Sequence, residues 1–190
     1  IVELYSIMPV ANLSSVMRHG ILCHEKAAAL AHGDISMAAI QERRDRVRVP
    51  GGLMLHQYAN LYLDARNPMM YKRRDQVDQL CVLSITATIL QVDDVVVADQ
   101  NASSDYVRFY SADGIGNLDL DLVYADDWRH PNQIAYWRHK SAKCAEVLVP
   151  SEVPAGYIQK AYVASNVARS AVLQSGFSRP VEFMPRLFFR

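Results

Sequence analysis

Strand-like and helix-like segments follow one another irregularly along this chain, and that irregularity limits the folds it can adopt. Apolar residues that are β-branched or alternate with polar ones predict strands at 2–7, 56–65, 80–90, 93–99, 145–150, 157–165 and 181–190. Helical patterns bounded by Pro or Gly predict helices at 9–19, 35–44 and 166–176. A doubly wound sheet needs a regular strand–helix–strand order, so we expect an α+β fold instead.

Two segments lack a clear hydrophobic period. Residues 23–34 are rich in small residues and histidine, which predicts an irregular loop. Residues 101–143 contain turn residues, scattered aromatic side chains and both tryptophans. A long stretch of this kind inside a compact domain is often functional, and we expect it to contact a substrate.

Composition indicates one compact domain over residues 1–190. Hydrophobic residues make up 51% of the chain and charged residues 21%, and no repeat or Gly/Ser-rich linker divides it. The three cysteines form no CxxC pair, which argues against a disulfide framework and favours a reducing compartment. No apolar run approaches the ~20 residues that cross a membrane, and the N-terminus lacks the basic start of a signal peptide. We therefore expect a soluble cytoplasmic protein with no membrane partner.

The charge distribution leaves a nucleic-acid partner open. The formal net charge is zero, which by itself argues against nonspecific binding of a polyanion. Basic residues nevertheless gather at 43–48, 72–74 and 138–143. A neutral protein can present one positive face, because phosphates respond to the local field rather than to the net charge. Ordinary solvated loops and helix ends explain the same clusters equally well.

Familiar motifs are missing from the chain. The glycines at 114–116 do not lie between a strand and a helix, and there is no P-loop, so any dinucleotide binds without a Rossmann turn. His19, Cys23, His24 and His32 are close in sequence, but their spacing fits no zinc pattern, so we expect no metal. No GxSxG motif indicates a serine nucleophile.

An arginine at a helix end and a carboxylate at a strand start remain as candidates. Arg43 precedes a forced chain reversal, where a guanidinium can grip a pyrophosphate or simply be solvated. Glu146 opens the strand EVLVP, and alternation places it on the same face as Leu148. A carboxylate that shares a face with Leu is costly to bury unpaired, although an exposed strand-start Glu is the commoner case. The residues alone leave both interpretations open.

Five blocks in the same order resemble a known family. The opening LYSIMPVANLSSVMRHGIL is similar to Y-H-I-T-x-x-x-N-L-x-x-I-L-x-x-G-x-L, and LYLDARNPMMY resembles F-Y-F-x-P-R-S-P-M-L-Y. IQERRDRVRVPGG lies between them, NASSDYVRFY follows, and KCAEVLVPSEVP with YIQKAYV completes the series. Together they resemble the DarT-type nucleic-acid ADP-ribosyltransferases, a toxin family. The resemblance implies a compact ADP-ribosyltransferase fold with central split β-sheets and flanking helices.

The resemblance also implies roles for individual residues. Glu146 matches the catalytic glutamate, and Arg43 matches the NAD-binding arginine that works with it. The motif positions that shape the NAD+ site are Tyr5, Ser6, Ile7, Asn12, Leu22, Arg43, Arg66, Pro68, Met69 and Tyr71. The expected contacts to the acceptor nucleic acid are Arg108, Trp137, Lys140 and Lys143. No metal is implied, and NAD+ is a substrate rather than a resident cofactor.

The implied reaction is transfer of ADP-ribose from NAD+ to a base in single-stranded DNA. A carboxylate stabilises the oxocarbenium-like ribose and takes a proton as the base nitrogen attacks. Ser6 replaces the histidine of much of the family, which leads us to favour guanine over thymine as the acceptor. The family also implies an antitoxin that reverses or blocks the modification. The same fold acting on RNA or protein, or an inactive module that binds NAD+ or nucleic acid, are the alternatives.

Overall fold

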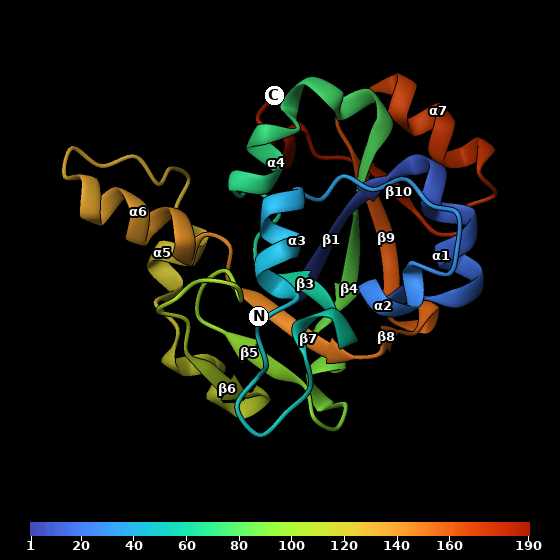
Figure 1. Cartoon of the computed structure of the whole chain (residues 1–190). Coiled ribbons are helices and arrows are strands. Elements are labelled where there is room, and N and C mark those ends of the chain that lie inside the picture. The colour runs from blue at the N-terminus through green and yellow to red at the C-terminus, as the bar shows by residue number, and fades with distance from the viewer.

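The computed structural model describes residues 1–190 and shows a mixed α+β architecture (Figure 1). The strands are β1 (Glu3–Pro9), β2 (Ile21–Leu22), β3 (Tyr58–Tyr62), β4 (Leu80–Thr86), β5 (Val96–Ala98), β6 (Phe109–Ser111), β7 (Glu146–Pro150), β8 (Glu152–Val153), β9 (Ile158–Val163) and β10 (Val181–Phe183). The helices are α1 (Leu13–His19), α2 (His24–Ala27), α3 (Ala38–Arg44), α4 (Pro68–Lys72), α5 (Leu120–Tyr124), α6 (Gln133–Ala142) and α7 (Asn166–Gln174). The predicted α+β class is confirmed.

One large sheet organises the molecule. Eight strands lie in the order β10-β9-β4-β1-β3-β7-β5-β6, and β2 pairs with β8 in a separate two-stranded sheet. All neighbours in the large sheet are antiparallel except β9 and β10, which are parallel. Strand β7 lies inside this sheet, so its first residue, Glu146, has Tyr62 of β3 on one side and Ala98 of β5 on the other.

Strand β4 is buried on both faces, which explains why its sequence does not alternate with polar residues. Leu83 and Ile85 belong to the larger apolar core, while Leu80 and Val82 belong to a smaller one on the opposite face. Helix α7 covers the larger core through Ala168 and Val172. The sheet therefore stands between two hydrophobic layers, and its strands hold fixed positions.

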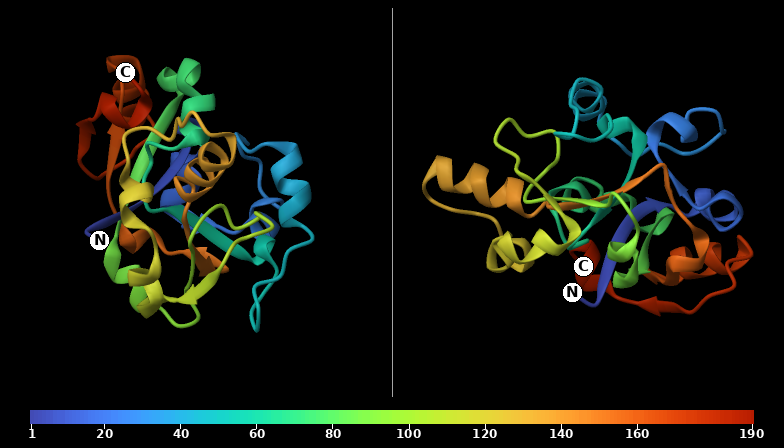
Figure 2. Two further views of the ribbon diagram at one scale, coloured as in Figure 1. Left: turned by 90° about the vertical axis from the view of Figure 1, so that its left-hand side faces the viewer. Right: turned by 90° about the horizontal axis from the view of Figure 1, so that it is seen from below.

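Helices α5 and α6 form a lobe that projects from the sheet (Figures 1 and 2). The expected irregular stretch 101–143 contains this lobe and strand β6, so it was only partly irregular. Helix α6 was missed because it has no continuous apolar stripe: Ile134 and Trp137 are exposed, and only Ala142 is buried. No helix in the chain is both long enough and apolar enough to cross a membrane.

Three other predicted segments differ in detail. The predicted strand 80–90 ends at Thr86, whose hydroxyl accepts a hydrogen bond from the N–H of Thr88 and starts a 3-10 turn. The predicted strand 181–190 ends at Phe183, and a 3-10 turn that begins at Pro185 follows it. The predicted loop 23–34 contains the short helix α2.

Candidate active site

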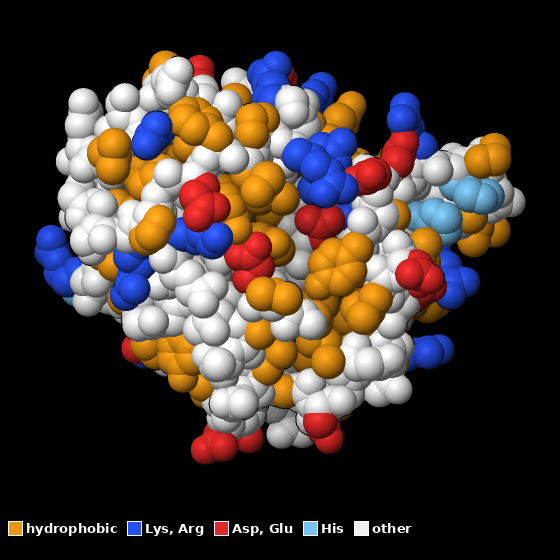
Figure 3. Space-filling view, turned by 180° about the vertical axis from the view of Figure 1, so that it is seen from behind, with side chains coloured by type: hydrophobic (Ala, Val, Ile, Leu, Met, Phe, Trp, Pro, Cys, Tyr) orange, Lys and Arg blue, Asp and Glu red, His pale blue; other side chains and the backbone are white.

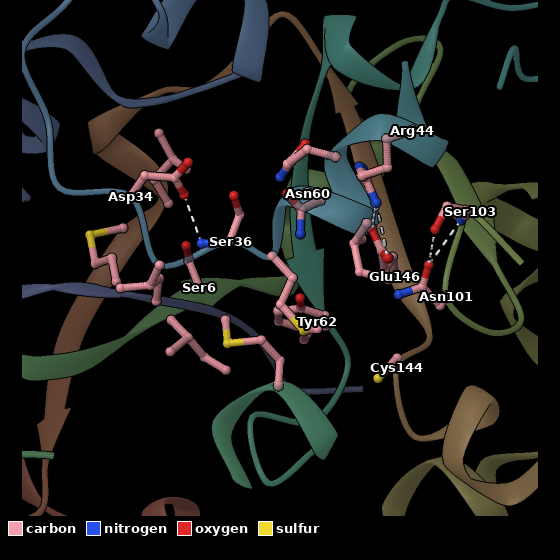
Figure 4. A pocket seen from close by; sticks show the side chains of 18 of the residues that line it. Ser6, Asp34, Ser36, Arg44, Asn60, Tyr62, Asn101, Ser103, Cys144 and Glu146 are labelled. Atoms are coloured by element: carbon pink, nitrogen blue, oxygen red, sulfur yellow. Dashed lines mark hydrogen bonds and ion pairs between the residues drawn. The ribbon is translucent and has the colours of Figure 1, made fainter. Parts of the chain in front are cut away.

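A cavity of about 960 Å³ opens beside the middle of the large sheet, within the range typical of ligand sites. Strands β1 and β3, the end of α3 and the segment before β7 contribute to its walls. The segment 99–107 and helix α6 border it on the side of the projecting lobe. Figure 4 shows Glu146 directed toward Arg44, with Asn101 and Ser103 beside the pair.

Glu146 is inside the protein, with only 1% of its side chain exposed. Its Oε2 lies 2.9 Å from Nη1 of Arg44, and its Oε1 accepts hydrogen bonds from the same nitrogen and from the N–H of Ala102 at 3.2 Å. The solvated strand-start interpretation is therefore wrong. A buried carboxylate requires such a partner, because a lone charge in the interior is very costly.

The predicted alternation along β7 is confirmed by the packing. Val147 and Val149 join the larger core, whereas Leu148 joins a different cluster on the side where Glu146 lies. The rigid sheet on both sides of β7 thus holds the carboxylate at a fixed position on the cavity wall.

Arg44, and not Arg43, is the partner of Glu146, so the expected pairing was wrong by one residue. Successive residues of an α-helix are rotated by about 100°, so the last turn of α3 turns Arg44 toward β7 and leaves Arg43 exposed. Both arginines line the cavity. Adjacent arginines at a helix end give no sequence signal that tells which one is buried, and Arg44 was missed for that reason.

One nitrogen of Arg44 has no protein partner. Its Nη2 is buried and makes no hydrogen bond, although buried donors almost always have an acceptor. Since Arg44 lines the cavity, this nitrogen is available to an acceptor atom of a ligand bound beside Glu146.

Two further ionisable neighbours of Glu146, Cys144 and Tyr62, stay uncharged near neutral pH. Burial, followed by the charge of Glu146, raises the pKa of the Cys144 thiol to about 12 and also raises the pKa of Tyr62. A thiol in that state is a poor nucleophile near neutral pH. Cys144 is therefore not suited to covalent catalysis. No three His, Cys, Asp or Glu side chains come together as a metal-binding group.

Several of the expected NAD+-site residues line the cavity. They are Ser6, Ile7, Asn12, Leu22, Arg43, Pro68 and Met69. The side chain of Asn12 also exchanges two hydrogen bonds of 2.8 Å with the backbone of Gly33, which fixes the segment after α2 over the cavity. Residues from four separate parts of the sequence thus meet around one space.

A family model described as "ssDNA thymidine ADP-ribosyltransferase, DarT" matches residues 5–189. The chain belongs to the DarT family. The family is described as one of ADP-ribosyltransferases that act on single-stranded DNA, so the resemblance indicated by the ordered motifs is confirmed.

Two relatives illustrate the similarity. A DNA ADP-ribosyl transferase–DNA ADP-ribosyl glycohydrolase fusion protein of Thermosipho africanus is 28% identical over 96% of this chain. The chain spans about half of that protein, 48% of its length, and superposes on the Thermosipho africanus DarTG structure in complex with ADP-ribose with a TM-score of 0.87. A DNA ADP-ribosyl transferase of Thermus sp. is 27% identical over 98% of this chain and 93% of its own length.

The Thermus sp. 2.9 DarT has been solved with ADP-ribosylated ssDNA and with NAD+. Those structures superpose with TM-scores of 0.85 and 0.79 at 24% and 21% identity, over 98% of this chain. At that identity the likeness establishes a shared fold over nearly all of both chains.

Three of the residues expected from the DarT motifs lie outside the cavity. Tyr5 donates its hydroxyl to Glu3 on β1, away from the cavity lining. Tyr71 packs edge-on against Trp128 and Phe189, and the guanidinium of Arg66 lies 4.1 Å from the Phe189 ring centre. Tyr71 and Arg66 thus both pack against Phe189, and none of the three side chains forms part of the cavity surface.

The expected acceptor contacts divide in the same way. Trp137 and Lys140 of α6 line the cavity, while Arg108 is exposed just before β6 and outside the lining. Lys143 is fully buried, and its Nζ is held by the carboxylate of Asp64 and by the carbonyl oxygen of Val123 at 2.8 Å. An ammonium occupied in this way cannot reach an acceptor strand, so the expected contact by Lys143 is wrong.

Lys143 instead anchors the projecting lobe. It follows directly after α6 and connects Val123 of α5 to Asp64, just beyond β3.

On the face opposite that of Figure 1, acidic and basic side chains are interspersed, and the histidines gather on the lobe (Figure 3). That face carries no continuous basic surface (Figure 3).

Replacing Lys143 by Met should lower the free energy of unfolding by about 3 kcal/mol, because Asp64 loses its buried partner. The matched control is Lys26→Met, since the Lys26–Glu152 pair is solvent-exposed and such pairs contribute less than about 1 kcal/mol. Urea unfolding followed by circular dichroism measures both. Equal effects of the two substitutions would contradict the anchoring role of Lys143.

Proposed function

We propose that this chain transfers the ADP-ribose moiety of NAD+ to a nucleobase in single-stranded DNA, with residues 1–190 acting as one transferase domain. The observation that carries the proposal is the buried Glu146–Arg44 pair on the wall of a cavity large enough for a dinucleotide. Membership of the DarT family supports the same reaction. In this proposal NAD+ binding and DNA modification take place at one site.

Glu146 acts on both halves of the transfer. The bond between the nicotinamide nitrogen and the ribose carbon breaks, and its electron pair leaves with neutral nicotinamide. The carboxylate stabilises the positive charge that develops on the ribose. A nitrogen of the acceptor base then forms the new bond to the ribose carbon, and Glu146 takes the proton that this nitrogen loses.

Arg44 and Ala102 keep the carboxylate in place during these steps. Their hydrogen bonds fix both carboxylate oxygens, so no reorganisation is needed when charge develops on the ribose. The unpartnered Nη2 of Arg44 supplies one further donor, which suits an oxygen of the ribose or of the acceptor base.

Arg43 has a separate role in this proposal. Its exposed guanidinium lines the cavity one residue before Arg44, where it can bind the pyrophosphate of NAD+ in a bidentate manner. The two neighbouring arginines thereby divide the work: Arg43 binds the phosphates and Arg44 orients the catalytic carboxylate.

The burial of Glu146 and the side chains beside the cavity both favour single-stranded DNA as the acceptor. A base within a duplex cannot reach a carboxylate that is 1% exposed, so the acceptor base must be unpaired. Trp137 and Lys140 on α6 supply a stacking surface and a positive charge beside the cavity. Arg108, exposed outside the cavity, is placed to contact the strand further along.

Two observations favour different acceptor bases. Ser6 is buried on the cavity wall in place of the histidine found in much of the family, and this departure favours guanine. The family description names thymidine and favours thymine. We further propose a toxin role with a cognate antitoxin, since the Thermosipho relative joins a DNA ADP-ribosyl transferase to a DNA ADP-ribosyl glycohydrolase in one chain.

Replacing Glu146 by Gln should lower the transfer rate at least about a hundredfold, because the amide carries no negative charge and takes no proton. The amide oxygen still accepts hydrogen bonds from Arg44 and Ala102, so NAD+ affinity should change by less than about threefold. Transfer of label from NAD+ to an oligonucleotide and calorimetric NAD+ titration measure the two effects. Glu152→Gln, on β8, serves as control; wild-type transfer by Glu146→Gln would remove Glu146 from the mechanism.

Replacing Arg43 by Ala should weaken NAD+ binding about tenfold or more, since a charge-assisted contact to the pyrophosphate is lost. Arg46→Ala is the matched control, because Arg46 is exposed on the same segment but pairs with Glu42. Calorimetry with NAD+ distinguishes them. An unchanged affinity in Arg43→Ala would show that the pyrophosphate binds elsewhere.

The acceptor is identified by incubating the protein with labelled NAD+ and single strands that contain only one modifiable base. We expect label on guanine-containing or thymine-containing strands, little on duplex DNA, and about tenfold weaker binding from 50 to 200 mM salt for two or three phosphate contacts. Label found only on RNA or only on protein would show that this molecule, and not DNA, is the acceptor. DNA binding without any transfer would instead identify an inactive binding module.

A further inference from the structure

The segment between β5 and β6, residues 99–108, places Ala102 beside the carboxylate of Glu146 and Tyr106 on the lining of the cavity. At its base the N–H of Ala102 donates to Glu146, and the N–H of Asn101 donates to the carbonyl oxygen of Ser141 in α6 at 3.2 Å. Asn101 also accepts hydrogen bonds from the backbone and hydroxyl of Ser103. The base of the segment is therefore rigidly connected to β7 and to α6.

Tyr106 lies near the tip of this segment, and its side chain is unusually open. The residue is 86% exposed although it lines the cavity, and its ring packs against no other aromatic ring. Tyrosine rings usually bury most of their apolar surface. A ring that borders a cavity but touches so little of the protein has its surface available to a ligand.

Trp137 borders the same cavity from α6 and is 60% exposed. Two large aromatic side chains thus border the cavity from separate elements, and those elements are connected by the hydrogen bond from Asn101 to Ser141. Each successive base of an unpaired strand presents a flat face that can stack on such a ring, whatever the base is.

The charges around the two rings give the strand an orientation. Asp105 precedes Tyr106 on the same cavity border and repels phosphates, whereas Lys140 lies one turn after Trp137 and attracts them. The sugar–phosphate backbone is therefore favoured along α6, and the bases are favoured toward Tyr106.

We infer that Tyr106 is an acceptor-contacting residue, which stacks on a base of the single strand at the cavity mouth opposite Trp137. This inference rests on the proposed function and adds to it a residue and a way of holding the strand. Because the same segment donates the Ala102 hydrogen bond to Glu146, the strand is held by an element that also orients the catalytic carboxylate.

The test compares Tyr106→Ala with Tyr106→Phe, which keeps the ring. We expect Tyr106→Ala to raise the KM for a single-stranded oligonucleotide about tenfold, with kcat at saturating strand and the Kd for NAD+ unchanged. Tyr106→Phe should remain within about twofold of wild type. Tyr124→Ala, a partly exposed tyrosine of α5 outside the cavity lining, is the matched control and should leave all three constants unchanged.

A strand with abasic sites flanking the acceptor base provides the second measurement. Wild type should lose affinity for it, and Tyr106→Ala should lose little more, since the stacked base is already missing. An unchanged KM in Tyr106→Ala, or a fall in kcat alone, overturns the inference and leaves the segment as a support for Glu146. Absence of transfer by the wild-type protein overturns the proposed function itself, so the two failures are distinguishable.

Discussion

The buried pair of Glu146 and Arg44 is the interaction on which the rest of the site depends. A carboxylate with 1% exposure persists inside a protein only when a cation and further donors compensate for its lost hydration. Two chain segments meet that requirement for Glu146 of β7: the end of α3 supplies the cation, and the backbone at Ala102 supplies a further donor. The sheet holds β7, and the hydrogen bond from Asn101 to Ser141 of α6 holds the segment of Ala102, so the compensation of one charge brings together residues that are distant in the sequence.

The position of β7 within the sheet makes this arrangement stiff. Hydrogen bonds from β3 and β5 hold both of its edges, and core residues occupy both of its faces. Lys143 adds a second buried ion pair three residues before Glu146, which connects the approach to β7 with Asp64 beyond β3. The proposed catalytic group thus stands on a rigid element, while Tyr106 and Trp137 border the cavity from a loop and from a projecting helix. Such a division is typical of binding sites, where a rigid scaffold positions variable loops.

The sequence predicted the strands of the core well, because their branched residues satisfy local preference and burial together. Strand β4 and helix α7 are examples in which both effects agree. Helix α6 was not predictable, since its sequence has no apolar stripe and it is stabilised at its end by contacts distant in the chain. Position and alternation marked Glu146 as a candidate, but only the ordered motifs gave it a role, because a strand-start carboxylate is usually solvated. Nothing local indicates that Arg44 or Lys143 is buried, since their partners lie 102 and 79 residues away.

The burial of Glu146 also bears on why transfer to DNA competes with simple hydrolysis of NAD+. A side chain with 1% exposure has little contact with bulk water, so in the proposed reaction Glu146 has few water molecules beside it to activate in place of the acceptor base. An unpaired base brought to the cavity by stacking and phosphate contacts arrives with a high effective concentration, which favours its attack over that of water. In the proposed mechanism, the acceptor is therefore selected both by the exclusion of solvent from the carboxylate and by the contacts that the strand makes with the protein.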